Sequence, residues 1–271
     1  MHKVLILDFG SQYTQLIARR IREMQVYCEI HPCNIPLEQI FDFKPQAVIL
    51  SGGPASVLAK GSPKINPEIF EMGIPVLGIC YGMQLMAHLL GGKVVPAKHR
   101  EYGRAIISQS TRGPLFSGLP EKSAVWMSHG DSIHKVPPGF TIDATTENGI
   151  IAAMSHSAKK FYALQFHPEV VHTEIGEKIL RNFLFGIGNV SADWNMHNFI
   201  ERSCTELREK IGKKKVILGL SGGVDSSVAA VLLHKAIGNQ LTCIFINNGL
   251  LRKNEAAEVE KIFKKHYRIR L

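Results

Sequence analysis

One cysteine of the chain has the local sequence of a nucleophile. It lies in the run Gly78-Ile79-Cys80-Tyr81-Gly82, directly after an apolar stretch. Glycines two residues before and two residues after a nucleophile allow a tight strand-to-helix turn to approach neighbouring backbone without a side-chain clash. The positive end of the following helix then stabilises a thiolate. We therefore predict an exposed, activated Cys80 and interpret the other cysteines as inert: Cys28, Cys33, Cys204 and Cys243.

A base and an orienting group for this thiol follow a second apolar stretch. Residues 161–166 have the pattern of a strand, and the chain continues into His167-Pro168-Glu169. In extended backbone, residues two apart point to the same side, so Glu169 can orient the His167 ring while His167 accepts the thiol proton. An isolated His-Pro-Glu more often forms an ordinary surface pair near a helix start. Combined with Cys80, it predicts a Cys–His–Glu catalytic set.

Acyl transfer also needs hydrogen-bond donors for the oxyanion that develops on the substrate. The backbone N–H of Tyr81, directly after the nucleophile, is one such donor. A second can come from the loop Ser51-Gly52-Gly53-Pro54, because this loop and the Cys80 turn leave the same edge of the predicted sheet. Each motif alone is weakly specific, and their order and combination carry the prediction.

A second loop has the composition of a phosphate site. The strand candidate Val216–Leu220 leads into Ser221-Gly222-Gly223-Val224-Asp225-Ser226-Ser227. Glycines permit close approach of the backbone, and successive N–H groups, hydroxyls and a helix N-terminus all favour an anion. The Gly-Lys-Ser/Thr ending of a Walker A loop is missing. The alternative is an ordinary Gly/Ser turn in which Asp225 or Ser226 caps the helix.

The elements that must position these residues follow an α/β pattern. Short apolar runs end in turns and lead into helical segments, which predicts a mostly parallel sheet flanked by helices. The first runs are Val4–Leu7, Ala47–Leu50 and Val76–Ile79. Later, closely spaced strand candidates predict an antiparallel extension: Arg104–Ser110, Ala124–Met127, Phe140–Thr145, Ile151–Met154 and Phe161–Phe166. A helix is predicted over Thr173–Phe185.

A Gly-containing stretch at 186–191 separates this region from a second α/β series. We predict one domain over residues 1–187, a linker over 188–195 and a second, Rossmann-like domain over 196–271. The elements expected in the second domain are Val216–Leu220, Asp225–Ile237, Leu241–Ile246 and Asn254–Tyr267. Two strands and two helices are too few for a whole nucleotide-binding sheet, so we expect this domain to be incomplete and the chain to be part of a longer enzyme.

The charge of the chain invites a nucleic-acid function. The 271 residues include 32 Lys and Arg against 23 Asp and Glu, a formal net charge of +9, and a basic surface attracts polyanions. The basic runs Lys213-Lys214-Lys215 and 264–270 favour this interpretation. Neither run has the aromatic interleaving of a single-strand binder. Small phosphate ligands are the favoured explanation, and we expect no nucleic-acid polymer as partner.

Cysteine usage and hydropathy bear on the compartment. Five cysteines without a Cys-x-x-Cys pair argue against a disulfide framework or a zinc cage and favour a reducing compartment. The first residues do not resemble a secretory signal, and the chain lacks the stretch of about 18 apolar residues that a membrane helix needs. We expect a cytoplasmic protein that does not contact a membrane.

Three segments around Cys80 resemble the signatures of class I glutamine amidotransferase domains. They are residues 51–54, 78–84 and 165–169, and the resemblance covers about residues 1–187. It implies that Cys80 attacks the side-chain amide of glutamine and releases ammonia, after which water hydrolyses the glutamyl thioester. It also implies an oxyanion hole at Gly53 and Tyr81, and glutamine contacts from Gln84, Ser128 and Gly130.

The loop at 221–227 resembles the PP-loop of the ATP pyrophosphatases, which cleave ATP between the α- and β-phosphates to adenylate an oxygen. The resemblance implies ATP binding, with Mg²⁺, by Ser221, Gly222, Gly223, Val224, Asp225, Ser226 and Ser227. Asp225 is the candidate for positioning the metal. Asn247 departs from the pattern, because many members of that family have Asp there.

The order of the two regions resembles the GMP synthetase family, as do residues 100–104, 127–131, 172–173 and 249–255. This resemblance implies that ATP adenylates the C2 oxygen of xanthosine monophosphate and that ammonia from the Cys80 reaction displaces AMP to give GMP. Ammonia then has to pass between the two sites through a channel or by domain motion. The resemblance further implies a homodimer formed through a C-terminal domain that this sequence does not include.

Two other functions are left open by the sequence. One is a stand-alone cysteine hydrolase of the same fold, a glutaminase or γ-glutamyl hydrolase without synthetase activity, and the loop at 221–227 argues against it. The other is a catalytically silent binding or regulatory module. Its expected sign is a replaced triad residue, whereas Cys80, His167 and Glu169 are all present. An enzyme is therefore favoured.

Overall fold

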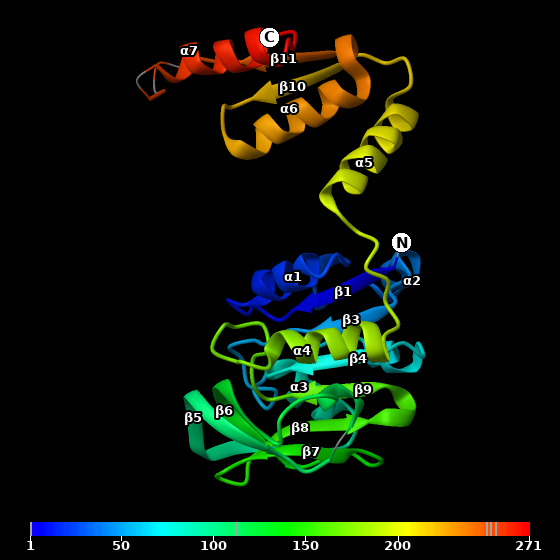
Figure 1. The fold of residues 1–271 in the computed structure, drawn as a ribbon, viewed down its shortest axis with the longest axis vertical. Coiled ribbons are helices and arrows are strands. Elements are labelled where there is room, and N and C mark those ends of the chain that lie inside the picture. Colours follow the sequence, from blue (N-terminus) through cyan, green and yellow to red (C-terminus); the bar gives the residue numbers. More distant parts are fainter. Residues whose placement is uncertain (1, 112, 248, 250, 253) are drawn as a thin grey trace. The chain divides into compact units, whose positions relative to one another are not determined.

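The structure is a computed structural model, and it describes residues 2–111, 113–247, 249, 251–252 and 254–271. Contacts divide the chain into two compact units, residues 1–194 and 195–271, and each unit is described by itself (Figure 1). Part of the predicted linker packs on the first unit. Val190 is buried, and the Trp194 N–H donates to the Gln25 carbonyl oxygen at 2.9 Å. These contacts extend the first unit to Trp194.

A mixed sheet forms the centre of the first unit. Its strands are β1 (Lys3–Asp8), β2 (Tyr27–Pro32), β3 (Ala47–Leu50), β4 (Val76–Ile79), β5 (Lys93–Gln109), β6 (Lys122–Lys135), β7 (Thr141–Thr146), β8 (Ile151–His156) and β9 (Phe161–Leu164). The order across the sheet is β2-β1-β3-β4-β9-β8-β7-β5-β6. Strands β2, β1, β3, β4 and β9 run parallel, and the others join by antiparallel pairing. The predicted parallel sheet with an antiparallel extension is confirmed.

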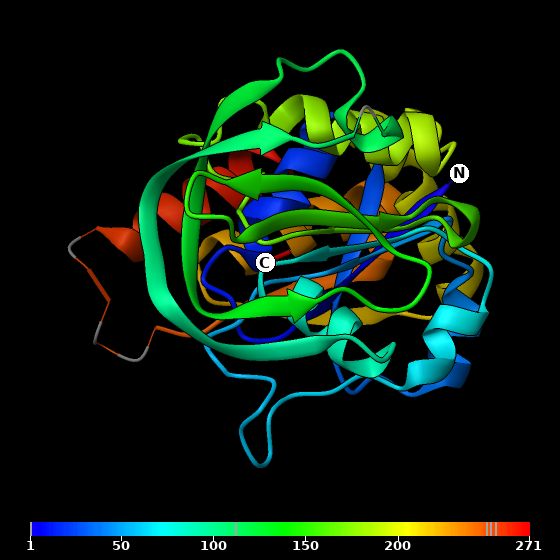
Figure 2. The same cartoon turned by 90° about the horizontal axis from the view of Figure 1, so that it is seen from below.

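The strands of the extension are longer than the sequence predicted. β5 begins at Lys93 rather than Arg104, and β6 continues past Met127 to Lys135. The polar run 128–132 conceals the second half of β6 from an interpretation based on apolar residues. The pairing of β5 and β6 shifts register between Pro96 and Glu101, and both strands curve in Figure 2. Strand β2 was not predicted, because it carries polar residues among the apolar ones.

Helices pack on both faces of this sheet. They are α1 (Thr14–Glu23), α2 (Leu37–Phe43), α3 (Tyr81–Leu89) and α4 (Gly176–Arg181), which continues as a π-helical turn over Asn182–Ile187. Short 3₁₀ turns span Pro67–Glu71, Pro114–Phe116 and Ser157–Lys159. Strand β1 alternates between two buried clusters: Val4 and Ile6 belong to the one that includes α1 and α4, whereas Leu5 and Leu7 belong to the one that includes α3.

The second unit contains a short parallel sheet with helices. Its elements are α5 (Met196–Ile211), β10 (Val216–Leu220), α6 (Val224–Ile237), a 3₁₀ turn (Gly238–Gln240), β11 (Leu241–Phe245), α7 (Glu255–Glu260) and a π-helical turn (Lys261–His266). β10 and β11 pair in parallel. The buried cluster includes Cys204, Leu220 and Phe263, but Ile217 and Ile244 are 71% and 47% exposed. The predicted order of elements is confirmed, with the last helix beginning one residue later, at Glu255.

Two further findings concern the cysteines and the hydropathy of the helices. All five cysteines are free. In the part of the chain that the structure describes, none of the helices has both the length and the apolar character needed to cross a membrane.

Candidate active site

Cys80 lies in a sharp turn between strand β4 and helix α3. Its φ of 51° is in the left-handed region, and Cys80 is the N-cap residue of α3. A Cβ on Gly78 would lie 2.7 Å from the Gly82 carbonyl oxygen, and a Cβ on Gly82 would clash with the carbonyl oxygen of Leu50. Close backbone packing therefore requires both glycines, which is the physical reason for their spacing around the cysteine.

The Cys80 side chain is more enclosed than the sequence predicted. The residue is only 4% exposed, so the expectation of an exposed sulfur is wrong. A loop and a strand cover it: Gly52 lies close to both Cys80 and His167, and Cys80 Sγ lies 3.4 Å from the carbonyl oxygen of Ser128 in β6. These contacts come from segments distant in sequence, which a local pattern does not reveal.

Strand β9 lies beside β4 and brings His167 and Glu169 to the cysteine. The Cys80 N–H donates to the Leu164 carbonyl oxygen at 2.7 Å, which joins the two strand ends. His167 Nδ1 lies 2.7 Å from Glu169 Oε1, so Nδ1 donates to the carboxylate and Nε2 is left for the thiol. Both side chains are buried. The structure thus brings together the three residues that the sequence predicted as a catalytic set.

The neighbours of His167 set its charge. Burial alone would lower the pKa of the imidazole, but its hydrogen bonds to Cys80 and Glu169 outweigh that effect and raise the pKa to about 10. An imidazole with this pKa is protonated at neutral pH. The imidazolium therefore holds a proton next to the sulfur.

Contacts from α1 and the preceding loop support the His167–Glu169 segment. Arg20 Nε donates to the main-chain carbonyl of Glu169 at 3.1 Å. The Tyr13 ring meets the His167 ring edge-on, with 5.1 Å between centroids. Glu169 Oε2 is buried and has no hydrogen-bond partner among the described residues. The hydrogen bond that the Glu169 carboxylate accepts through Oε1 therefore comes from the imidazole.

Two cavities meet at Cys80. One, of about 240 Å³, is lined by Gly10, Ser11, Gln12, Tyr13, Gly53, Pro54, Cys80, Ser128 and His167. The other, of about 490 Å³, is lined by Gly53, Pro54, Ala55, Ser56, Cys80, Gln84, Pro96, Tyr102, Ser128, His129, Gly130 and Asp131. A small substrate can therefore reach the sulfur although the residue itself is buried.

The two predicted oxyanion groups lie on either side of the nucleophile. Tyr81 is the first residue of α3, so its N–H has no acceptor within the helix. Gly53 borders both cavities, and a Cβ there would lie 2.7 Å from the Phe9 carbonyl oxygen. Its loop is fixed to the nucleophile turn because the Gly82 N–H donates to the Ser51 carbonyl oxygen at 3.1 Å.

The predicted glutamine-binding residues line one wall of the larger cavity. Gln84, Ser128 and Gly130 all border it. Gln84 Nε2 donates to the Asp131 carbonyl oxygen at 3.0 Å and to Gln165 Oε1 at 3.2 Å. The Gln84 side chain therefore holds the backbone of the 128–131 segment in place.

Sequence reasoning missed a buried polar pair behind this wall. His129 Nδ1 lies 2.9 Å from the Asp131 carbonyl oxygen, and His129 Nε2 lies 3.4 Å from Glu101 Oε2. Glu101 Oε1 accepts hydrogen bonds from Thr146 and Asn148 at 3.1 and 3.0 Å. Both residues lie in segments that the family resemblance marked, 100–104 and 127–131. Their contact depends on the pairing of β5 with β6, which places Glu101 opposite His129 and which the predicted shorter strands did not include.

The sequence predicts that the loop after β1 lies at the ligand-binding edge of the sheet, but it assigns no role in the site to the residues of this loop or to Tyr102. In the structure, residues 10–13 line the smaller cavity, and Tyr102, which is 65% exposed, borders the larger one.

The predicted phosphate loop connects β10 to α6 in the second unit. Gly222 has a φ of 83°, and Gly223 is the N-cap residue of α6. The Ser226 hydroxyl accepts the Ser221 N–H at 3.2 Å, and the Ser227 hydroxyl donates to the Gly223 carbonyl oxygen at 2.7 Å. The alternative in which Asp225 or Ser226 caps the helix is not what the structure shows.

The candidate metal position is sparse in ligands. Asp225 lies in the first turn of α6 and is exposed. Across the described ranges, His, Cys, Asp and Glu residues form no group of three or more that could hold a metal ion. Asn247 Oδ1 accepts the Gly249 N–H at 3.0 Å, so this side chain stabilises its own turn.

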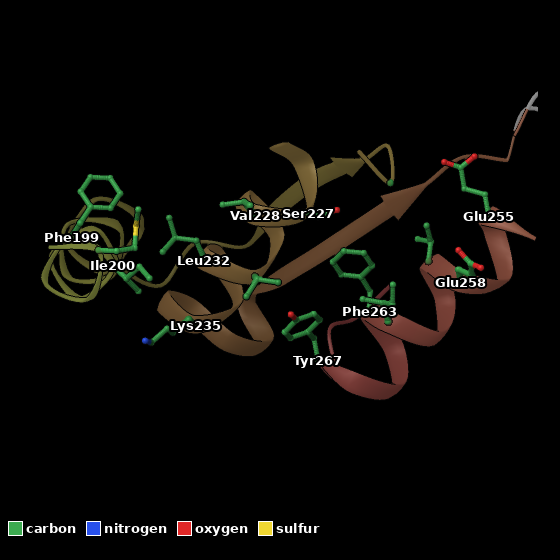
Figure 3. A pocket seen from close by; sticks show the side chains of 15 residues that line it. Phe199, Ile200, Ser227, Val228, Leu232, Lys235, Glu255, Glu258, Phe263 and Tyr267 are labelled. Carbon is green, nitrogen blue, oxygen red and sulfur yellow. The ribbon is translucent and has the colours of Figure 1, made fainter. Parts of the chain in front are cut away.

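An apolar groove of about 690 Å³ lies beside this loop, within the second unit. Figure 3 shows Phe199, Ile200 and Leu232 at one end and Phe263 and Tyr267 facing them. Gly222 and Ser227 of the loop also border the groove, together with Glu255 and Glu258 of α7.

Each unit matches a different family model. Residues 5–187 match the model described as glutamine amidotransferase class-I, and residues 196–266 match the model described as NAD synthase. The first match alone spans more than half of the chain.

Relatives extend the likeness through both units. The chain is 55% identical over 269 residues to a protein of Carboxydothermus hydrogenoformans and 56% identical over 270 residues to one of Maridesulfovibrio salexigens, both named glutamine-hydrolysing GMP synthase. These matches include 99% of this chain but 53% and 52% of those proteins, so the chain spans about half the length of the curated relatives that it matches.

A solved structure resembles the first unit. It is a protein of Thermoplasma acidophilum, described provisionally as one subunit of a GMP synthase, and it superposes with a TM-score of 0.64 at 33% identity. The match covers 74% of this chain and 98% of that one. By this relative, by the family model and by the site around Cys80, the chain belongs to the class-I glutamine amidotransferase family.

Proposed function

We propose that this chain is the glutaminase unit and the beginning of the ATP-dependent unit of a glutamine-hydrolysing GMP synthase. The reaction is GMP synthesis from xanthosine monophosphate, ATP and glutamine. The observation that carries the proposal is the identity of 55% to such an enzyme over 99% of the chain, which runs through both the buried Cys80 site and the loop at 221–227.

The geometry around Cys80 supports a glutaminase mechanism. The sulfur attacks the side-chain amide carbon of glutamine, and the raised pKa of His167 means that the ring already holds the proton which the departing ammonia takes. Cleavage of the C–N bond leaves a glutamyl thioester on Cys80. A water molecule, deprotonated by His167, then hydrolyses the thioester to glutamate, while Glu169 keeps the ring oriented.

The substrate oxygen and the rest of glutamine have separate binding groups in this proposal. The N–H groups of Gly53 and Tyr81 stabilise the oxyanion, because Gly53 lines the cavity at Cys80 and Tyr81 follows Cys80 at the start of α3. Glutamine occupies the larger cavity against Gln84, Ser128 and Gly130. The role of each of these residues is part of the proposal.

The loop at 221–227 supplies the chemistry for ATP. Two glycines, three hydroxyls and the N-terminus of α6 form a donor set that suits phosphate oxygens, and the exposed Asp225 carboxylate is a suitable oxygen ligand for Mg²⁺. Bound Mg²⁺ would neutralise charge on the phosphates. The Glu255 carboxylate also lies beside the loop, near Gly222, and phosphate and water oxygens would complete the ligands of the ion.

The second half of the reaction uses the products of the first. The C2 oxygen of xanthosine monophosphate attacks the α-phosphorus of ATP and pyrophosphate leaves; ammonia from glutamine then attacks C2, and AMP leaves. The homodimer and the cytoplasmic location that the sequence predicts belong to this same proposal.

A stand-alone glutaminase is the second candidate. It is favoured by the fact that Cys80, His167 and Glu169 and their contacts all lie within the first unit. Under this alternative, glutamate release does not respond to ATP or xanthosine monophosphate.

Isotope transfer tests the proposed function. The protein that carries this chain is incubated with ATP, xanthosine monophosphate and glutamine labelled with ¹⁵N in the amide, and GMP is analysed by mass spectrometry. We expect the label in the 2-amino group of GMP, with little dilution by unlabelled external ammonium.

The matched control is Cys80→Ala. It should lose GMP formation from glutamine but keep GMP formation from added ammonium, because only the glutaminase site is changed. GMP that acquires no label, or a Cys80→Ala protein that still uses glutamine, contradicts the proposal.

A further inference from the structure

A closed ring of three hydrogen bonds joins the segment that carries His167 to strand β6. The His167 N–H donates to the Trp126 carbonyl oxygen at 3.0 Å. The Trp126 N–H donates to Thr173 Oγ1 at 3.0 Å, and the Thr173 hydroxyl donates to the His167 carbonyl oxygen at 2.7 Å. Thr173 is 4% exposed, so this ring is shielded from water.

The Thr173 hydroxyl supplies a hydrogen-bond donor that the backbone around His167 lacks. Pro168 has no N–H, and the residues from His167 to Val170 are buried, so their backbone has few donors and little water nearby. The hydroxyl donates to one backbone group and accepts from another, which satisfies two polar groups that would be costly to bury alone. No apolar side chain of the same shape can do this.

Thr173 is itself held in place by its own turn. The Thr173 N–H donates to the Val170 carbonyl oxygen at 3.1 Å, and the Gly176 N–H donates to the Thr173 carbonyl oxygen at 3.0 Å. A Cβ on Gly176 would clash with the Pro168 carbonyl oxygen, so the start of α4 lies directly against the His167 segment. The hydroxyl is therefore preorganised before it bonds to His167.

The three hydrogen bonds connect two segments that both contact Cys80, namely β6 and the segment that carries His167. Trp126 stands two residues before Ser128 on β6, and the Ser128 carbonyl oxygen lies 3.4 Å from Cys80 Sγ. The same hydrogen bonds hold His167, whose imidazole faces the same sulfur. A shift of the His167 backbone relative to β6 thus changes the distance between the imidazole and the thiol.

We propose that Thr173 is a positioning residue of the glutaminase reaction, whose hydroxyl fixes the His167 imidazole at reacting distance from Cys80 by tying the His167 backbone to β6. The proposal rests on the glutaminase function proposed above. Thr173 does not touch the substrate in this role, since it lines neither cavity of the site.

Thr173→Val tests the role because it keeps the side-chain volume and removes the hydroxyl. A misplacement of about 1 Å can cost about 100-fold in rate, so we expect kcat to fall about 10- to 100-fold. KM for glutamine should change less than about threefold, because the predicted binding groups lie on α3 and β6. Thr173→Ser restores the hydroxyl and should restore kcat to within about threefold of the original protein.

A second readout follows the thiol without turnover. The titratable side chains that face the His167 ring are Cys80, Glu169 from its own segment and Tyr13 from the loop after β1. Because the His167 imidazole contacts Cys80, the pH profile of Cys80 alkylation by iodoacetamide reports on this contact. In Thr173→Val the imidazole is displaced, and the alkylation profile should differ from that of the original protein.

Thr141→Val is the matched control. The Thr141 hydroxyl also donates to a main-chain carbonyl, that of Ser155 at 3.3 Å, but it joins β7 to β8 and lines neither cavity. It should leave kcat and the alkylation profile unchanged. Thermal unfolding of every variant gives the folded fraction to which rates are normalised.

Two results overturn the proposal: a Thr173→Val protein with unchanged kcat per folded molecule, or one whose alkylation profile matches that of the original protein. If the chain is not a glutaminase, the same experiment gives a different result. In that case the original protein releases no glutamate from glutamine, while the shift in alkylation between Thr173→Val and Thr173→Ser is still present and supports the positioning role.

Discussion

The site around Cys80 and the loop at 221–227 each follow a parallel β-strand, yet they are held in different ways. Cys80, His167 and Glu169 are all buried, and their contacts join residues from β4, β6 and β9 that are far apart in sequence. The loop is mostly exposed, and its hydroxyls bond to residues within five positions along the chain.

This difference separates two ways of preparing a site. A nucleophile needs one fixed geometry, so the first unit uses close backbone packing and buried hydrogen bonds to hold it. A phosphate loop needs accessible N–H groups and hydroxyls, and local bonds are enough to shape it. The first site should therefore be sensitive to changes in distant packing, and the loop should tolerate small changes in its surroundings.

Removal of the nucleophile gives the largest expected effect. Cys80→Ala should lower glutamine hydrolysis by about 10⁴-fold or more, because the residues of a catalytic set act as a unit. Glutamate release at saturating glutamine measures it. Nucleotide binding at the 221–227 loop provides the comparison between the two sites. It should be unaffected by Cys80→Ala. Substantial residual hydrolysis would mean that another group performs the attack.

Substitution of the strand glycine before each loop tests the packing contrast directly. Gly78→Ala in β4 places a Cβ 2.7 Å from the Gly82 carbonyl oxygen, and we expect a loss of more than about 4 kcal/mol in the free energy of unfolding. Gly219→Ala in β10 meets nothing within 4 Å and should change it by less than about 0.5 kcal/mol.

Hydrogen exchange followed by mass spectrometry suits this test, since its peptides report on each unit separately. Equal protection losses in the two variants would contradict the contrast between the sites.

Glu169→Gln should have an intermediate effect, about 100-fold on glutamine hydrolysis, because the carboxylate orients the ring and stabilises its charge. It also has a pH signature. The pKa of His167 is raised from 6.5 to about 10, so the stability it provides is fully present below pH 6.5 and is lost as the pH rises towards about 10.

Urea midpoints measured across this pH range should fall in the original protein and fall less in Glu169→Gln, which removes one cause of the raised pKa. Parallel curves for the two proteins would show that Glu169 does not stabilise the imidazolium.

The smallest effect is expected for a hydroxyl of the exposed loop. Ser226→Ala removes the acceptor of the Ser221 N–H, but water can replace it, so the free energy of unfolding should change by less than about 1 kcal/mol. Thermal unfolding of the second unit, followed by circular dichroism, measures the change. A larger loss would show that the loop depends on its hydroxyl network as strongly as the first site depends on buried contacts.

Local patterns were enough to predict much of this molecule. The glycines around Cys80 and the Gly/Ser loop mark tight turns, and short apolar runs mark parallel strands, because each follows from residues adjacent in sequence. The mixed sheet and the order of elements in the second unit were predicted in this way.

The remaining features depend on contacts between distant segments. The burial of Cys80 comes from the loop at Gly52 and from strand β6 at Ser128, and the pairing of Glu101 with His129 needs the register of β5 and β6. Polar residues within β6 conceal that register from apolar periodicity. The His167–Trp126–Thr173 ring is similarly invisible to local reasoning, since its members come from separate elements.

The position of β9 in the sheet has a consequence for the order of events during synthesis. β4 with Cys80 leaves the ribosome early, but its neighbour β9 follows only after β5 to β8 have been made. Such long-range pairing forms late in folding. Until β9 pairs with β4, Cys80 of the nascent chain therefore lacks its partner His167 and is an ordinary thiol. The reactive site forms only when the surrounding unit can enclose it.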